Sequence, residues 1–297
     1  MENRVKLLPT MDLLFKKLLC SKDSTHILKA FIRDILGKEF KSLKPRETYH
    51  IDSYKKAYDE NPELMRTEVD ILAEIEDGSH VTIEMQIQPH EYFIERSLFY
   101  LLEAFRSSLG NQETEDFIKS NNFSALRPAY GINIIDFHLF EQDGAAIRKF
   151  GLLDLSSHKP LPARQGDELI MLCFFSLKNR NIDRNSPAYL WHQFFKTGEV
   201  PEDAPNYLKE AQKKTDYYSL NEEEQKMIMD MNKAKMINDA VLSTAVRKAR
   251  EEVKAEAKAE KLEIALNLLK IGLSTEQVAD STKLTIEEVE KLRKTLV

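Results

Sequence analysis

Two runs of alternating residues, separated by a turn sequence, form the clearest pattern in the chain. Residues 69–75 and 81–88 place Val, Ile, Ala or Met at every second position, with Asp77-Gly78-Ser79 between them. This period of two predicts half-buried strands, and a short loop containing glycine predicts a hairpin turn. The remaining positions include Asp70 and Glu84, two acids at sites where strands rarely carry them.

The length of the turn decides whether these two acids point to the same face of the sheet. A two-residue turn would place Asp70 opposite Met85, so Asp70 and Glu84 would point to opposite faces. A three-residue loop at 77–79 would instead place Asp70 opposite Gln86. Glu84 would then be a diagonal neighbour of Asp70 on the same face. A shared acidic site therefore requires a loop of odd length, or a bulge that restores the same parity.

Helices and further strands are predicted on both sides of the hairpin. Apolar residues at helical spacing predict a first helix near 10–19, with Thr10 as its N-cap and Asp12 in its first turn. Arg96 and Tyr100 are four residues apart on a later helix and therefore share a face. The other predicted elements are helices over 27–36 and 93–105 and strands over 46–58, 130–140 and 169–177.

The pattern is helical from Ala188 to the C-terminus. It predicts a compact core of residues 1–187, a helical extension over 188–238 packed on that core, a charged helix or linker over 239–263, and a C-terminal helical hairpin over 264–297. Capping boxes begin at Ser274 and Thr285. Because acidic residues follow Thr285 where a recognition helix would meet DNA, a protein-contact or dimerising hairpin is favoured over a reader of DNA sequence.

Composition sets the broad class of the protein. The 297 residues are 42% hydrophobic, which is enough for one large domain with appendages. The longest apolar run, 170–177, is too short to span a membrane, and the N-terminus lacks a signal-peptide pattern. Cys20 and Cys173 lie in apolar surroundings, which predicts buried free thiols and a cytoplasmic protein.

Charge is unevenly distributed along the chain. The net charge is −6, but residues 1–56 contain 13 Lys and Arg against 7 Asp and Glu. A basic N-terminal segment beside an acidic site would attract a phosphate backbone, although a solvated helix face gives the same pattern. The seven His residues show no zinc-ligand spacing, and no nucleotide-binding glycine loop is present in the sequence.

An ordered set of short motifs resembles a known family. The set comprises the segment from Asp12 to Lys16 (DLLFK), Asp70, the IEMQ segment at 83–86, and Arg96 with Tyr100. It is similar to the recombination-promoting nuclease and transposase family, a branch of the PD-(D/E)XK nuclease superfamily. The resemblance covers roughly residues 7–180 and, more loosely, the helical tail. It implies an α/β fold with a restriction-endonuclease-like mixed β-sheet flanked by helices, followed by an all-helical C-terminal region.

The resemblance also implies a metal site. Phosphodiester hydrolysis requires an activated water and neutralisation of charge in the transition state, and a hard divalent cation supplies both. Asp70 and Glu84 are the expected ligands of one Mg²⁺. Asp12 is expected to complete that site or to hold a second ion. If instead Asp12 only meets the dipole of its helix, it would have no part in the site.

The remaining motif residues are expected to act on water and phosphate. Gln86 stands where the wider superfamily has lysine, so it would orient the attacking water by hydrogen bonds without supplying charge. Lys16 or Arg96 would supply that charge, and Tyr100 would bind a phosphate oxygen. In the plainer alternative, Arg96 merely pairs with Glu103 or Glu91.

We therefore expect a Mg²⁺-dependent DNA endonuclease whose cuts promote recombination, with DNA as its partner, no membrane association and a homodimer formed through the C-terminal helices. One alternative is a catalytically weak or inactive module of the same fold that binds DNA or protein. A second alternative is a regulator that reads DNA through its tail.

Overall fold

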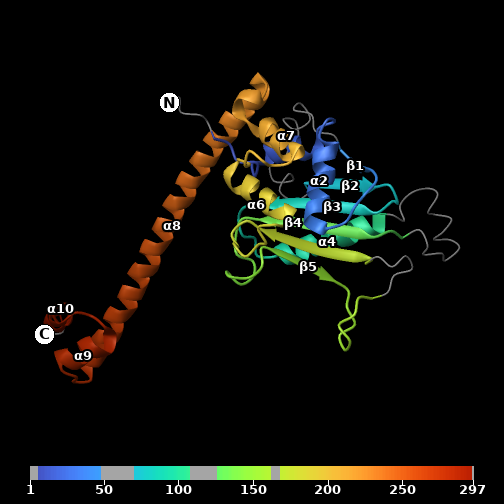
Figure 1. Ribbon diagram of the computed structural model, residues 1–297. Coiled ribbons are helices and arrows are strands. Elements are labelled where there is room, and N and C mark those ends of the chain that lie inside the picture. The colour runs from blue at the N-terminus through green and yellow to red at the C-terminus, as the bar shows by residue number, and fades with distance from the viewer. Residues whose placement is uncertain (1–5, 48–69, 108–125, 162–167, 296–297) are drawn as a thin grey trace. The chain divides into compact units, whose positions relative to one another are not determined.

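The computed structural model describes residues 6–47, 70–107, 126–161 and 168–295. The chain divides into two compact units, residues 1–227 and 228–297. A β-sheet with helices on both faces forms the first unit, and the second unit is helical in the part of it that is described (Figure 1). This architecture confirms the expected α/β fold with a mixed sheet and a helical C-terminal region.

A mixed sheet of six strands forms the centre of the first unit. In spatial order the strands are β1 (Leu43–Pro45), β2 (Ile71–Ile75), β3 (His80–Gln86), β4 (Ala129–Ile135), β6 (Ile170–Ser176) and β5 (Ile147–Gly151). β3, β4 and β6 are parallel, whereas β1, β2 and β5 each pair antiparallel with their neighbours. A strand covered on both faces by helices is apolar throughout, which explains the continuous apolar character of β4 and β6.

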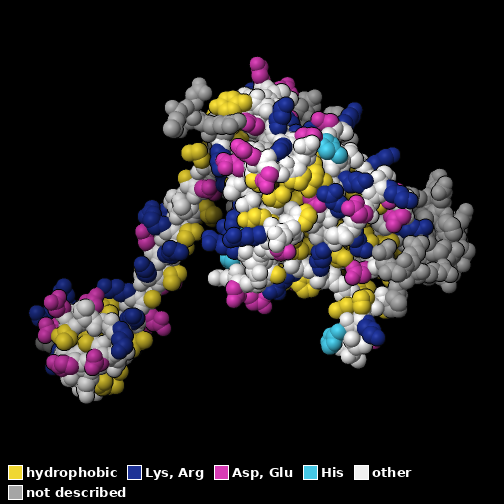
Figure 2. All heavy atoms as spheres, viewed as in Figure 1, with side chains coloured by type: hydrophobic (Ala, Val, Ile, Leu, Met, Phe, Trp, Pro, Cys, Tyr) yellow, Lys and Arg dark blue, Asp and Glu magenta, His cyan; other side chains and the backbone are white. Residues whose placement is uncertain are grey.

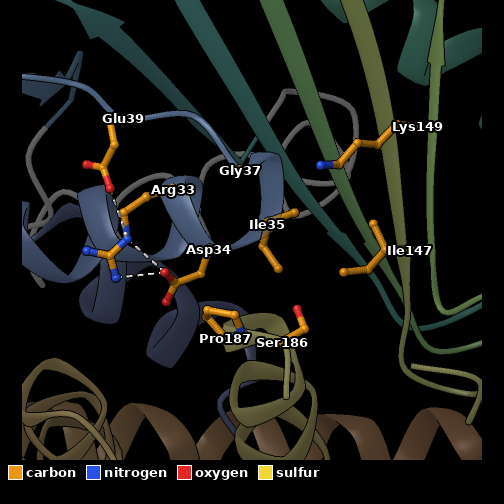
Figure 3. A pocket seen from close by; sticks show the side chains of 9 residues that line it. All are labelled: Arg33, Asp34, Ile35, Gly37, Glu39, Ile147, Lys149, Ser186 and Pro187. Atoms are coloured by element: carbon orange, nitrogen blue, oxygen red, sulfur yellow. Dashed lines mark hydrogen bonds and ion pairs between the residues drawn. The ribbon is translucent and has the colours of Figure 1, made fainter. Parts of the chain in front are cut away.

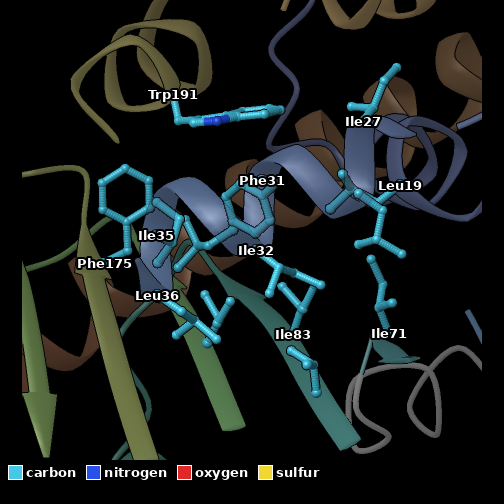
Figure 4. Close-up of a cluster of buried hydrophobic side chains, with 14 of the residues drawn as sticks. Leu19, Ile27, Phe31, Ile32, Ile35, Leu36, Ile71, Ile83, Phe175 and Trp191 are labelled. Carbon is cyan, nitrogen blue, oxygen red and sulfur yellow. The ribbon is translucent and has the colours of Figure 1, made fainter. Parts of the chain in front are cut away.

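Helices cover both faces of this sheet. Residues of α1 (Asp12–Cys20), α2 (Thr25–Leu36), α6 (Pro187–Thr197) and α7 (Asn206–Thr215) form one core with one face, and α4 (Phe93–Ser107) packs on the other. Phe31 meets Trp191 edge to face, with ring centroids 5.1 Å apart (Figure 4). Fully burying side chains of this size contributes about 1.5–3 kcal/mol each. This packing holds α1 and α2 against the strands that carry the acids.

Two predicted elements differ in their bounds from the structure, and a third falls almost wholly outside the described residues. β4 ends at Ile135, and the residues up to 140 form a connection in which Asp136 pairs with Lys178 at 3.7 Å. The N-cap of α1 is Met11 rather than Thr10, and its side chain makes no capping bond. The predicted strand over 46–58 lies almost wholly outside the described residues.

The boundary between the two units falls within one long helix. α8 runs from Glu222 to Lys270 and contains the predicted charged helix of residues 239–263. It is followed by α9 (Thr275–Thr282) and α10 (Ile286–Lys294), and both predicted capping boxes are present. Figure 2 shows acidic and basic side chains interspersed over this unit. The caps confirm that local sequence alone specifies where these two helices start.

Two further expectations concern the whole chain. Within the described ranges, no helix has both the length and the apolar character that crossing a lipid bilayer demands. Cys20 and Cys173 are buried free thiols, as predicted, and burial raises the pKa of each to about 12. Neither thiol is therefore a reactive nucleophile at neutral pH.

Candidate active site

The hairpin between β2 and β3 has a loop of three residues, Glu76-Asp77-Gly78. Ile75 and Ser79 close it, since the N–H of Ile75 donates to the carbonyl of Ser79 at 2.9 Å. Gly78 has φ 84°, the left-handed conformation needed at the last position of such a loop. The loop therefore starts one residue earlier than predicted, but its odd length is confirmed.

This loop sets the register of the hairpin next to Asp70 and Glu84. Ile71 lies opposite Ile83, the last pair of the ladder, and Asp70 and Glu84 are the next residues outward on the two segments. The prediction that Asp70 lies opposite Gln86 was therefore wrong. Asp70 itself lies just outside β2, and its carboxylate accepts from the backbone N–H of Met85.

Asp70 lies at the open end of the hairpin, where β2 begins. Its Oδ2 accepts a hydrogen bond from the backbone N–H of Met85 at 2.7 Å, which holds the carboxylate against the end of β3. The pKa of Asp70 is raised to about 7, and burial is the largest cause. The negative charge of Asp12 also raises it and that of Glu84 does so less, whereas the hydrogen bond from Met85 and the positive charge of Lys16 lower it. Asp12 and Glu84 therefore each lie within electrostatic range of Asp70.

Asp12 and Lys16 reach this region from α1. The apolar residues of α1, including Phe15 and Leu19, are buried in the core. Asp12 and Lys16 are one turn apart, with Lys16 Nζ 3.7 Å from Asp12 Oδ1, and both remain partly exposed. The start of α1 thus adds one acid and one base to the acidic end of the hairpin.

Glu84 is held by an ion pair beneath α4. The residue is only 5% exposed, and Nη2 of Arg96 donates to its Oε1. Burial raises the pKa of Glu84, and the positive charge of Arg96 opposes that shift. Oε2 of Glu84 is buried without a hydrogen-bond partner among the described residues. An ionised oxygen left in this state is costly unless another group binds it.

Arg96 also connects Gln86 to Glu84. Its Nη2 donates to Gln86 Oε1 at 2.7 Å, while Gln86 Nε2 donates to the carbonyl of Gln88 at 2.8 Å. Arg96 therefore does not take the plainer alternative of pairing with an acid of its own helix. Tyr100 follows Arg96 by one turn on α4, as the sequence predicted.

Asn133 is a site neighbour that sequence analysis did not single out. It lies beside Glu84 on β4, is 3% exposed, and donates from Nδ2 to the carbonyl of Cys173 at 3.3 Å. An amide inside an otherwise apolar strand is unusual. The only sequence signal for Asn133 was its polar side chain within this strand. Its position next to Glu84 depends on the pairing of β4 with β3.

The donor set fits a hard divalent cation in its chemistry. Carboxylate oxygens are the preferred protein ligands of Mg²⁺, and the unpaired oxygen of Glu84 is one such donor. The part of the chain that the structure describes contains no group of three His, Cys, Asp or Glu side chains already arranged to hold a metal. Asp12, Asp70 and Glu84 therefore do not form such a group as they stand here.

A shallow pocket of about 450 Å³ lies elsewhere, between the end of α2, β5 and the start of α6 (Figure 3). Its charged groups bind one another and the backbone. Arg33 pairs with Asp34 at 2.7 Å, and Lys149 donates to the carbonyl of Leu36 at 2.7 Å. Asp34 also accepts from the indole of Trp191 at 2.9 Å, so the pocket's polar groups serve the fold.

Comparison with known proteins agrees with the motifs. Neither a curated protein nor a solved structure matches the chain. Residues 9–283 match the family model described as PD-(D/E)XK nuclease family transposase, a span that includes every predicted site residue. Because this match covers nearly the whole chain, and the mixed sheet flanked by helices is consistent with it, the chain belongs to the PD-(D/E)XK nuclease family transposases.

Proposed function

We propose that this protein is a Mg²⁺-dependent DNA endonuclease whose cuts promote recombination. The observation that supports the proposal is the hairpin register, whose last pair, Ile71 with Ile83, directly precedes Asp70 and Glu84. The charge of Asp12 acts on the same carboxylate of Asp70. Family membership supports nuclease chemistry with DNA as the substrate.

Asp70, the unpaired Oε2 of Glu84 and Asp12 would hold the cation. When bound, Mg²⁺ supplies charge neutralisation at the scissile phosphate and lowers the pKa of a bound water. Burial and Asp12 hold the pKa of Asp70 near neutrality in the absence of a cation. A bound cation would favour the ionised form of these carboxyl groups, as expected at a cation site.

Other side chains of the site would act on water and phosphate. The amide of Gln86 can orient a water molecule but carries no charge. Arg96 donates to Gln86 and would supply the positive charge that lysine brings in the wider superfamily. Lys16 adds a second positive charge beside Asp12, and Tyr100 would donate to a phosphate oxygen.

The C-terminal helices are proposed to join two copies of the chain. In α10, the carboxylate of Glu288 binds Lys258 at 2.7 Å and caps its own helix, so acids occupy the position that would face DNA. The proposed organisation is a nuclease core of 1–187, a helical extension of 188–238, a charged helix of 239–263 and a terminal hairpin of 264–297.

The test is nicking of supercoiled plasmid with Mg²⁺ or EDTA. Asp70→Asn and Glu84→Gln keep side-chain shape but remove charge, and both should lose nicking. Glu74→Gln is the matched control, since Glu74 is an exposed acid on the same hairpin. If the wild type is inactive with Mg²⁺, or if both site variants remain active, the nuclease assignment to this face is wrong. A folded, inactive protein that still binds DNA would support the non-catalytic alternative.

A further inference from the structure

Two aromatic side chains are exposed beside the proposed site. Tyr92 and Phe99 are each 59% exposed, and Tyr100, partly buried, lies next to Phe99 with ring centroids 5.9 Å apart. We call Tyr92, Phe99 and Tyr100 the aromatic ridge. Leaving a phenylalanine ring in water forgoes the favourable free energy of burying it. Neighbouring exposed aromatic rings are therefore typical of a surface that binds a ligand or partner.

The ridge is continuous with the proposed site through Arg96. Tyr92 lies immediately before α4, and its carbonyl accepts the backbone N–H of Arg96 at 3.1 Å. Phe99 and Tyr100 follow Arg96 by three and four residues, so all of these side chains form one stripe along the helix. Arg96 itself reaches Glu84 and Gln86. Anything lying on the ridge therefore lies next to the proposed cation site.

Packing of α4 on the sheet does not explain the ridge. The helix uses its other side for that purpose, burying Phe93, Ser97, Leu101 and Ala104. The ring of Phe93, for example, contacts the rings of Phe137 and Phe174 in this core. Packing of α4 on the sheet therefore leaves Tyr92 and Phe99 exposed.

We propose that the aromatic ridge stacks on unpaired bases of the DNA substrate, so that the enzyme acts preferentially on DNA containing separated strands. This inference rests on the proposed nuclease function. Every base offers a flat π-face, and stacking on aromatic side chains is tolerant of sequence. Arg96 on the same stripe is ion-paired with Glu84, so the ridge would contribute stacking rather than a charged contact. Bases in a closed duplex stack on each other and do not offer these faces.

The experiment uses the full-length protein in EDTA, so that binding is measured without cleavage. Two DNA duplexes carry 2-aminopurine at one position, one fully paired and the other with that base in a short unpaired bubble. The wild type should bind the bubble more tightly and quench its fluorescence. Phe99→Ala should weaken bubble binding by roughly tenfold, whereas Phe99→Trp should preserve both affinity and quenching. Tyr218→Ala, at an exposed tyrosine in the 3-10 helix Tyr217–Ser219, should change nothing.

Several results would overturn the proposal. Equal affinity of the wild type for the paired and bubble DNA would do so, as would unchanged bubble binding in Phe99→Ala. Leu98→Ala removes a side chain that is 43% exposed on the neighbouring stripe of α4. If Phe99→Ala and Leu98→Ala both shift the molecular mass in solution instead of affecting quenching, the ridge binds a second copy.

Failure of the ridge can be told apart from failure of the nuclease assignment. Plasmid nicking that depends on Mg²⁺ and on Glu84 would uphold the enzyme even if the ridge variants bind normally. Bubble-specific binding lost in Phe99→Ala, without nicking by the wild type, would uphold the ridge and reject the enzyme.

Discussion

Both ends of the β2–β3 hairpin carry acidic residues, but the pKa values of these acids are shifted in opposite directions at the two ends. At the turn, the carboxylate of Glu76 accepts the backbone N–H groups of Lys41 and Ser42 at 2.8 and 3.1 Å. The bond from Lys41 lowers the pKa of Glu76. At the open end, burial raises the pKa of both Asp70 and Glu84.

This difference separates acids that stabilise the fold from acids that oppose it. Glu76 is ionised at neutral pH with its oxygens satisfied, so its charge favours the native state. Ionising Asp70 brings a further negative charge close to Asp12, and Glu84 keeps one buried oxygen unpaired. A protein gains no stability from that arrangement. The open end therefore has the character of a functional site, where unfavourable charge is retained for a ligand.

The largest expected effect distinguishes the two ends by activity. Asp70→Asn and Glu84→Gln should each lower the rate of Mg²⁺-dependent nicking by at least about a hundredfold, because each removes a cation ligand. The double variant should lose little more, since residues that act as a unit are not additive. Glu76→Gln, at the turn, should keep the wild-type rate. Initial rates of plasmid nicking measure all four proteins.

The next effect concerns stability at the open end. Arg96→Ala should lower the free energy of unfolding by about 3 kcal/mol, because it leaves the buried Glu84 carboxylate without its partner. Arg106→Ala is the control, since Arg106 is exposed and its pair with Glu103 should matter little. Chemical denaturation gives both values. Adding Glu84→Gln to Arg96→Ala should restore part of the loss; no restoration would mean that Arg96 acts through packing alone.

A third effect is the pH dependence of stability caused by Asp70. Its pKa rises from 3.8 to about 7 on folding, so the native state binds more protons than the unfolded state between these values. The stability contributed by Asp70 is therefore present below pH 4 and is lost as pH rises through 7. Asp70→Asn should be more stable than the wild type at pH 8, by on the order of 2 kcal/mol after allowing for solvent screening.

Urea titrations of both proteins at pH 5 and pH 8 test this effect. Adding Mg²⁺ at pH 8 should stabilise the wild type but not Asp70→Asn, because only the wild type offers the full set of ligands. A difference between the two proteins that does not change with pH would contradict the assigned pKa.

The smallest effect is expected at the turn. Glu76→Gln should slightly lower the melting temperature at pH 7, because an amide accepts backbone N–H bonds less strongly than a carboxylate does. The pKa of Glu76 is lowered in the folded state. The difference in melting temperature between the two proteins should therefore disappear as the pH falls through the folded-state pKa of Glu76. Thermal melts at pH 7 and pH 3 measure it.

Local sequence predicted the features that depend on neighbouring residues. The capping boxes at Ser274 and Thr285 are present because each involves residues only three apart. The odd loop length followed from strand parity. The predicted register was wrong because the predicted loop placed Gly78 at its middle position. In the structure Gly78, the left-handed residue, is the last residue of the loop.

Contacts between distant segments could not be predicted in this way. The ion pair of Arg96 with Glu84 depends on how α4 packs across the sheet, and Asn133 meets Glu84 only because β4 pairs with β3. β5 was missed because an exposed edge strand of only five residues carries little alternation. Tertiary packing, rather than local preference, positions most of the candidate site.

The central claim is that Asp70 and Glu84 bind one divalent cation between them. Anomalous diffraction from crystals soaked in Mn²⁺ tests it most directly, because the ion's position is located without assuming its ligands. A peak is expected between the two carboxylates, on the side where Asp12 approaches, and it should be lost in Glu84→Gln. A peak bound by other residues, or carboxylates of Asp70 and Glu84 directed to opposite faces of the sheet, would contradict it.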